Sequence, residues 1–97
     1  MNDALKIDKK DNVAVVIRPI AKGDQVIYNN YEYGQGKLEA LTDIPIYHKI
    51  ALNEIEEGEK VVKYGEHIGE ASRKIQAGEH VHTHNVSSVR ENLRNCE

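Results

Sequence analysis

Apolar residues along the chain occur in short, β-branched runs of strand length. The clearest run is Asn12–Ile17, which predicts a buried strand. Alternation of apolar and polar residues predicts a second strand over Ile44–Leu52. Two more strands are expected at Lys60–Tyr64 and at His80–Val86. The pattern therefore predicts a domain built mainly from short strands.

The segments between these runs are more polar. We expect residues 1–10 to form a frayed start or an edge strand, and residues 28–43 a loop or hairpin. Residues 72–75 could form a single helical turn, and residues 87–97 a polar helix or an exit linker. The loop carries three tyrosines, which either cover a partner surface, act as a mobile lid or pack on the domain's own core: Tyr28, Tyr31 and Tyr33.

An internal repeat is the strongest organisational signal. The pattern Ile-x-x-Gly-acid-x-Val occurs three times, at residues 20–26, 55–61 and 75–81. The glycine can supply the positive φ of a tight turn, and the valine begins the next strand. The copies are unevenly spaced, so a solenoid is not expected. The repeat predicts a chain that folds back on itself at three turns.

The composition agrees with a small β-rich domain. The chain has 97 residues, with 10 Ile and 9 Val against 5 Leu, and it contains neither Phe nor Trp. β-Branched residues pack better in strands than in helices. A chain of this length forms one domain with a modest core, and its single Cys excludes an internal disulfide.

Charge and hydropathy exclude several classes of partner. Thirteen basic and 16 acidic residues give a net charge of −3, and the basic residues are scattered, which argues against nucleic acid. No apolar run approaches the ~20 residues of a membrane-spanning helix, so no membrane partner is expected. The first residues lack the apolar core of a signal peptide, which makes a cytoplasmic location the expectation. A few local cations could still bind a small anionic substrate.

Histidines provide the main candidate chemistry. His80, His82 and His84 alternate, so in a strand their side chains share one face. Two imidazoles on that face could converge on one metal ion or one substrate, but a solvated face that carries histidines fits equally well. The pairs His48-Lys49 and Lys63-Tyr64 are weaker candidates, since each also fits an ordinary surface or strand end.

These residues resemble a known family. Residues 78–86, Gly-Glu-His-Val-His-Thr-His-Asn-Val, look like the signature of the UxaA family of sugar-acid dehydratases, in its N-terminal SAF domain. Three further blocks fit in the same order: residues 11–15, residues 46–52, and residues 62–65 followed by 68–71. Together the resemblance covers about residues 11–86. Tyr47 departs from the pattern, because the family usually has Gly before His-Lys.

The resemblance implies a fold and a function. It implies a mainly β, β-clip domain with one or two short helical turns, a single domain over residues 1–97 with a polar tail at 87–97. It further implies the separate small subunit of a lyase, inactive alone, that completes the active site of a large dehydratase subunit such as that of altronate dehydratase. The small subunit of a sulfolactate sulfo-lyase is the alternative. A non-catalytic module that binds a metal or a small acid, and a structural subunit that docks through the tyrosine loop, are alternatives of other classes.

The resemblance also assigns roles to residues. Members remove water or sulfite next to an α-hydroxy carboxylate, which requires an acid/base pair and stabilisation of an enediolate. Carried over, His82 and His84 act as acid/base or metal-facing residues, and His48 stands near them. Further candidates bind the anionic sugar acid: Lys49 and Lys63 at the carboxylate, Tyr64 as a donor, and Thr83 and Asn85 at the hydroxyls. The implied cofactor is a divalent metal, iron or alternatively manganese, held mostly by the large subunit. Without that partner, an edge-rich β domain could form a homo-oligomer.

Overall fold

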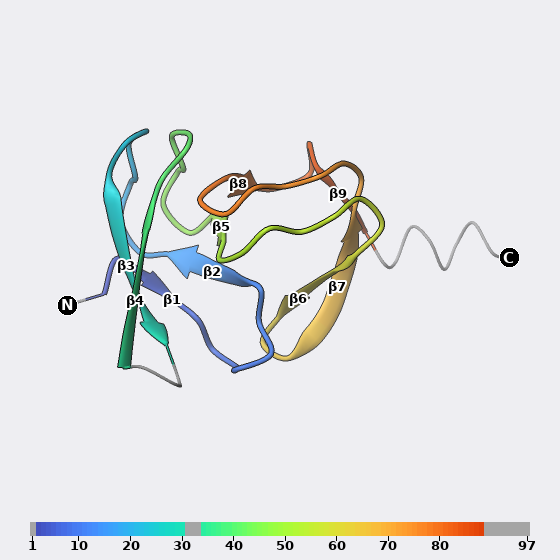
Figure 1. Ribbon diagram of the computed structural model, residues 1–97, viewed down its shortest axis with the longest axis horizontal. Helices are drawn as coiled ribbons and strands as arrows, with labels where there is room; N and C mark the ends of the chain where they lie inside the picture. The colour runs from blue at the N-terminus through green and yellow to red at the C-terminus, as the bar shows by residue number, and fades with distance from the viewer. Residues whose placement is uncertain (1, 31–33, 89–97) are drawn as a thin grey trace, which may run out of the picture.

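The part of the chain that the structure describes folds into short strands and contains no helix. The computed structural model describes residues 2–30 and 34–88, and in these ranges it contains nine strands (Figure 1). Their bounds are β1 Ala4–Leu5, β2 Val13–Val16, β3 Gln25–Asn30, β4 Gly34–Glu39, β5 Lys49–Ala51, β6 Lys60–Lys63, β7 Glu66–Ala71, β8 His80–Val81 and β9 Val86–Ser88. Within the described ranges, no helix is present that could cross a membrane. The arrangement is the small, mainly β clip that the sequence predicts.

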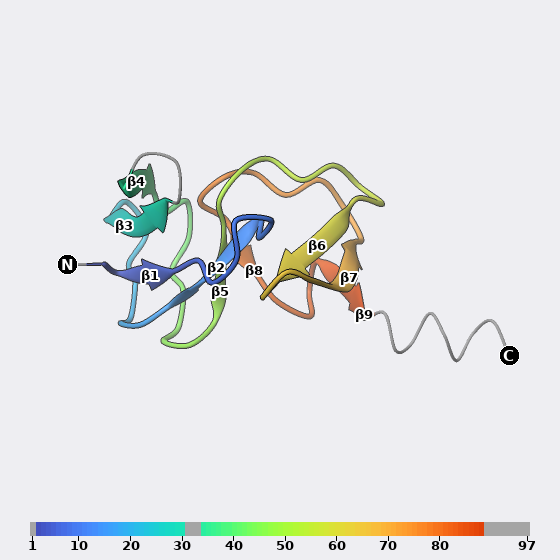
Figure 2. The same cartoon turned by 90° about the horizontal axis from the view of Figure 1, so that it is seen from below.

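The strands form two sheets. One has the order β4-β3-β1-β2-β5-β8 and the other the order β6-β7-β9. The β3–β4 hairpin and the three-stranded sheet lie at opposite ends of the molecule, with β2, β5 and β8 between them (Figures 1 and 2). Asn12 connects the two sheets through two hydrogen bonds to Val62. Its side-chain oxygen accepts a hydrogen bond from the Val62 backbone N–H, and its backbone N–H donates to the Val62 carbonyl.

Each end has its own core, and the central strands serve both. On β2, Val13 packs in one core and Val16 in the other. On β5, Ala51 packs in the same core as Val13, and Ile50 in the same core as Val16. This division follows from the two-residue period of a strand. An isoleucine pair in an isolated bridge lies in each core: Ile20 with Ile44, and Ile55 with Ile75.

The two halves of the chain repeat one pattern of backbone hydrogen bonds. Tyr47 donates to the Val16 carbonyl and Val16 donates to the His48 carbonyl. In the second half Gly78 donates to Ala51, and Ala51 donates to Glu79. Strand β5 therefore ends the first half and begins the second.

The repeat has four copies in three dimensions rather than three. The predicted turns are confirmed, since Gly23, Gly58 and Gly78 have φ of 92°, 86° and 90°. Residues 44–49 follow the same path, with an isolated bridge, a two-residue turn and a strand. In this fourth copy Tyr47 takes the glycine position with φ 71°, and His48 takes the position of the acid.

The predictions at Asn12–Ile17 and Lys60–Tyr64 are confirmed as strands β2 and β6. The strand predicted over Ile44–Leu52 is too long, because β5 covers only Lys49–Ala51 after the turn at Tyr47. The strand predicted over His80–Val86 is also wrong in part. β8 ends at Val81, and residues 82–85 form a turn before β9.

Three further expectations are corrected. Residues 72–75 form a bend rather than a helical turn, because Ser72 donates to the Asn85 carbonyl and Ile75 pairs with Ile55. Residues 2–10 give no edge strand, since their strand β1 lies between β3 and β2. The expected tail begins within β9, which includes residues 87 and 88, and residues 89–97 lie outside the described ranges.

The tyrosine-bearing loop is a hairpin of β3 and β4. Tyr28 lies in β3 and packs against the first core, which agrees with the core alternative for this residue. Tyr31 and Tyr33 lie outside the described residues.

Candidate functional site

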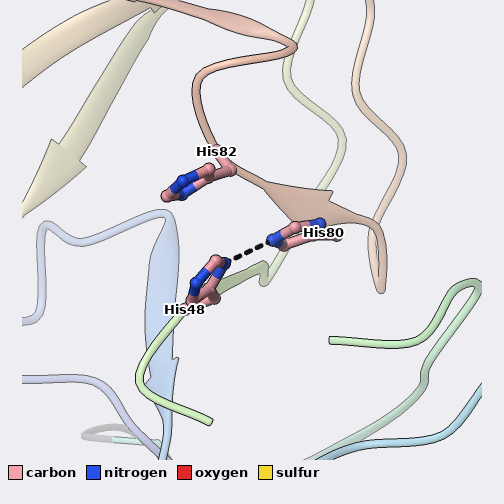
Figure 3. Close-up of side chains that lie close together, drawn as sticks. All are labelled: His48, His80 and His82. Atoms are coloured by element: carbon pink, nitrogen blue, oxygen red, sulfur yellow. Dashed lines mark hydrogen bonds between the residues drawn. The ribbon is translucent and has the colours of Figure 1, made fainter. Parts of the chain in front are cut away.

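Three histidines converge where β5 meets β8. His48 immediately precedes β5, His80 begins β8 opposite Ile50, and His82 follows β8. Figure 3 shows the three side chains close together, with the His48 and His80 rings facing each other. His48 Nδ1 lies 2.9 Å from His80 Nε2, and one nitrogen from each ring lies within 4.8 Å of the other two. The His48 and His82 rings are stacked with centroids 4.2 Å apart.

The surroundings of two of these imidazoles, those of His80 and His82, favour the neutral form. Burial, reinforced by the neighbouring histidines and Lys49, lowers the pKa of His80 to about 4. Burial also lowers the pKa of His82, and the nearby His48 and Lys49 act in the same direction. A neutral imidazole has a free lone pair, which can accept a proton or bind a metal.

The structure brings together part of the predicted histidine set. His82 and His48 lie in the cluster with His80, to which the family resemblance assigns no role. His84 is exposed, and its ring centroid lies 5.1 Å from that of His80. The signal that could have joined His48 to His80 is the fourth copy of the repeat. In that copy His48 takes the position that Glu79 has in the copy at residues 75–81, and Glu79 directly precedes His80.

A small pocket opens beside His82. It has a volume of about 180 Å³ and is lined by Lys49, Ile68, His82, Thr83 and Val86. Ile68 and Val86 provide an apolar wall, while the other three side chains are polar. Lys49 is half-buried, and its pKa is lowered by burial and by the charge of Lys63. An ammonium group held in such a pocket favours an anionic ligand.

Asn85 supports the turn that carries His82. Its side chain is fully buried, accepts a hydrogen bond from the His82 amide at 3.0 Å and donates to the His80 carbonyl at 2.8 Å. These local bonds compete with a continued strand and explain why β8 ends at Val81. Contact between Asn85 and a substrate hydroxyl stays a prediction.

Lys63 and Tyr64 stand at the turn between β6 and β7. The Lys63 ammonium lies 4.6 Å from the centre of the Tyr64 ring, and Tyr64 has a positive φ of 57°. Tyr64 is exposed, and Lys63 is near enough to Lys49 to lower its pKa. Their binding of substrate stays a prediction.

The three clustered nitrogens also fit a divalent transition metal. Imidazole nitrogen is a common ligand of zinc, iron, copper and nickel. No carboxylate joins the three nitrogens among residues 2–30 and 34–88. Three protein ligands with one position left for water or substrate are typical of catalytic rather than structural sites.

Comparison with known proteins places the chain in a family. Residues 2–89 match the altronate/galactarate dehydratase SAF domain. The chain is 43% identical to altronate dehydratase of Bacillus subtilis over 91% of its own length, but it covers only 17% of that relative. It is 36% identical to (2R)-sulfolactate sulfo-lyase subunit alpha of Chromohalobacter salexigens, over 86% of this chain and 90% of the subunit. The chain belongs to the altronate/galactarate dehydratase SAF domain family, as the sequence signature indicated.

Proposed function

We propose that the chain is the small subunit of a lyase that eliminates water from an α-hydroxy carboxylate, as altronate dehydratase would. The observation that supports this most directly is the convergence of His48, His80 and His82 beside the pocket at Lys49. The match to the dehydratase family supports the reaction class. The match to the alpha subunits of sulfolactate sulfo-lyases supports a separate, larger catalytic partner, which completes the site in this proposal.

In this proposal the pocket holds the substrate carboxylate. The Lys49 ammonium pairs with it, and the Thr83 hydroxyl offers a hydrogen bond at the same rim. A neutral His82 then accepts the proton from the carbon next to the carboxylate, since it lines the pocket and its pKa is lowered. As that C–H bond breaks, a carbon–carbon double bond forms and the hydroxyl leaves from the neighbouring carbon.

The leaving hydroxyl needs a proton to depart as water. His48 stacks on His82, and His84 is an exposed histidine of the same turn, so both are candidates for the acid. A divalent metal, iron or manganese, would supply a Lewis acid that stabilises the enediolate charge. Asn85 acts here as a positioning residue, because its side chain binds the backbone of His80 and His82.

The sulfolactate reaction is the second candidate, because the chain matches a (2R)-sulfolactate sulfo-lyase subunit alpha over 90% of that subunit. The same proton abstraction would then be followed by loss of sulfite rather than hydroxide.

The test is reconstitution with a large subunit. We would co-express the chain with the large lyase subunit of its own organism and assay altronate, galactarate and (2R)-sulfolactate with Fe²⁺. We expect turnover that needs both chains and falls by at least about 100-fold in His82→Ala, the range of a lost general base. His67→Ala is the matched control, because His67 is exposed on β7 and lies outside the cluster.

Each outcome separates the candidates. Turnover of altronate or galactarate would identify water as the product that leaves, and turnover of (2R)-sulfolactate would identify sulfite. A stable complex that turns over none of the three acids would contradict the proposal and favour a structural subunit. Binding of these acids by the chain without any association would favour the non-catalytic module.

A further inference from the structure

We propose that this chain by itself binds one divalent transition-metal ion through His48, His80 and His82. The proposal does not rest on the lyase function, and it differs from the expectation that a large subunit holds most of the metal ligands. An ion bound at His82 would occupy the lone pair of its neutral imidazole, so metal binding excludes the role of this residue as the base in the proposed reaction. It rests on how the described side chains lie, which Figure 3 shows.

The distances suit a shared ion. Two imidazole nitrogens bound to one tetrahedral zinc ion at about 2.0–2.1 Å lie roughly 3.3–3.4 Å apart. In the structure the His48 and His80 nitrogens are 2.9 Å apart, and the set of three lies within 4.8 Å. The His48 and His82 rings are stacked, so the rings must turn to bring all three in-plane lone pairs onto one ion.

The backbone that carries the ligands is fixed in advance. The turn before His48 is closed by the bond from its amide to the Pro45 carbonyl, and Val16 donates to the His48 carbonyl. Asn85 holds the carbonyl of His80 and the amide of His82. Ligands on such a braced frame lose little freedom when they bind an ion, which increases affinity.

The donor set selects the class of metal. Three imidazoles suit zinc, cobalt, iron or nickel, whereas calcium and magnesium require oxygen ligands. All three residues are half-buried, so the remaining coordination positions stay open to water or to a small acid. Lys49 lies near His80 and His82, and its positive charge opposes the ion. We therefore expect Lys49→Met to bind the metal more tightly than the unchanged chain.

The competing interpretation needs no metal. Two imidazole nitrogens at 2.9 Å also fit a simple hydrogen bond in which one ring donates its N–H to the other. The two interpretations differ in what happens when a metal salt is added to the purified chain.

The experiment is a titration of the purified full chain with Co²⁺, followed by its visible absorption bands, and then competition with Zn²⁺. We expect one ion per chain. His48→Ala, His80→Ala and His82→Ala should each weaken binding by more than about tenfold, the least expected for a lost ligand. His84→Ala and His67→Ala are the controls and should change the affinity by less than about threefold.

A second measurement avoids any mutation. Imidazole nitrogen NMR spectra of the chain with Zn²⁺ should show large shifts for His48, His80 and His82 only. Absence of Co²⁺ binding, or binding that none of the three substitutions weakens, would overturn the proposal and leave the hydrogen-bonded pair. Loss of binding in His84→Ala as large as in His82→Ala would replace this set with the His82 and His84 pair expected from the family resemblance.

Discussion

The turns at Tyr47–His48 and Gly78–Glu79 occupy equivalent positions in the two halves, and their backbones are bonded alike. His48 donates to the Pro45 carbonyl, and Glu79 donates to the Gln76 carbonyl. In each half the residue with positive φ, Tyr47 or Gly78, also donates to a central strand. The two turns therefore differ in their side chains and not in their path.

The side chains differ in what they contact. Glu79 accepts the Gln76 amide at 3.0 Å and pairs with Arg73 at 2.6 Å, so it stabilises its own turn. In the other turn Pro45 has no amide hydrogen to offer, and the His48 ring contacts His80 instead. Glu79 therefore closes its own turn, whereas His48, at the equivalent position, contacts His80 in the candidate site.

The difference shows where the domain gives up stability. Tyr47 adopts a left-handed φ that is unfavourable for any residue with a Cβ, and 71% of its surface is exposed. The turn has also lost the acid that caps its three counterparts. Departures from local rules of this kind are expected at functional sites.

The largest effect should come from the glycine of the structural turn. A Cβ at Gly78 would overlap the Glu39 carbonyl oxygen, whereas a Cβ at Gly58 meets nothing within 4 Å. Gly78→Ala combines left-handed strain with overpacking and should lower the free energy of unfolding by about 3 kcal/mol or more. Gly58→Ala adds only the left-handed strain and should lower the free energy of unfolding by about 1–2 kcal/mol.

Urea denaturation of the two variants measures the contrast. The φ values of the two glycines are nearly equal, 90° and 86°, so the difference isolates the close approach at Gly78. Equal losses in the two variants would show that the backbone around Glu39 yields, and would contradict this account of the turn.

Asn85 should give the next largest effect. Asn85→Ala leaves the His80 carbonyl and the His82 amide without their buried partner, which should lower the free energy of unfolding by about 2–3 kcal/mol. Asn53→Ala is the matched control, because Asn53 is exposed and its side chain bonds only to the neighbouring Glu54 carbonyl. A melting temperature that Asn85→Ala leaves unchanged would return this side chain to a purely substrate-binding role.

The same comparison explains what the sequence could predict. Three copies of the repeat were visible because glycine and an acid mark each turn. The fourth was hidden, since Tyr47 and His48 replace both markers. His48 belongs to the candidate site and stands where the repeat has its acid. A search for the repeat pattern of glycine and acid therefore does not find this turn.

Two other features depend on contacts between distant segments. The alternation of His80 and His82 predicts that they meet on a strand, but they meet because Asn85 bends the chain after Val81. Strand β1 has only two residues, and its parallel pairing of Ala4 with Tyr28 joins segments far apart in sequence. Local composition contains no signal for such a register.

A smaller effect, of opposite sign, is expected at Tyr47. Tyr47→Gly relieves the left-handed strain, while the extra freedom of glycine in the unfolded chain offsets part of that gain. The net result should be a rise of about 0.5–1 kcal/mol in the free energy of unfolding. Tyr47→Ala retains the strain and serves as the control, with no gain expected. Destabilisation by glycine would mean that the Tyr47 ring supports the fold, and that this turn does not sacrifice stability.

The smallest effect tests an ion pair beside another structural turn, where pH can be used as the variable. Asp24 accepts the Ala21 amide and pairs with Arg18, which also binds Asp3 at 2.8 Å. The hydrogen bond from Arg18 is the main cause that lowers the pKa of Asp3 below its ordinary 3.8. Because the folded pKa is depressed, the stabilisation is complete above pH 3.8 and is lost as the pH falls through the lower folded value. Asp3→Asn should therefore melt below the unchanged chain at pH 7, and the two melting temperatures should converge as the pH falls below 3.8. A difference between them that stays constant with pH would mean that Asp3 acts through packing and its bond to the Ile27 amide, and not through its charge.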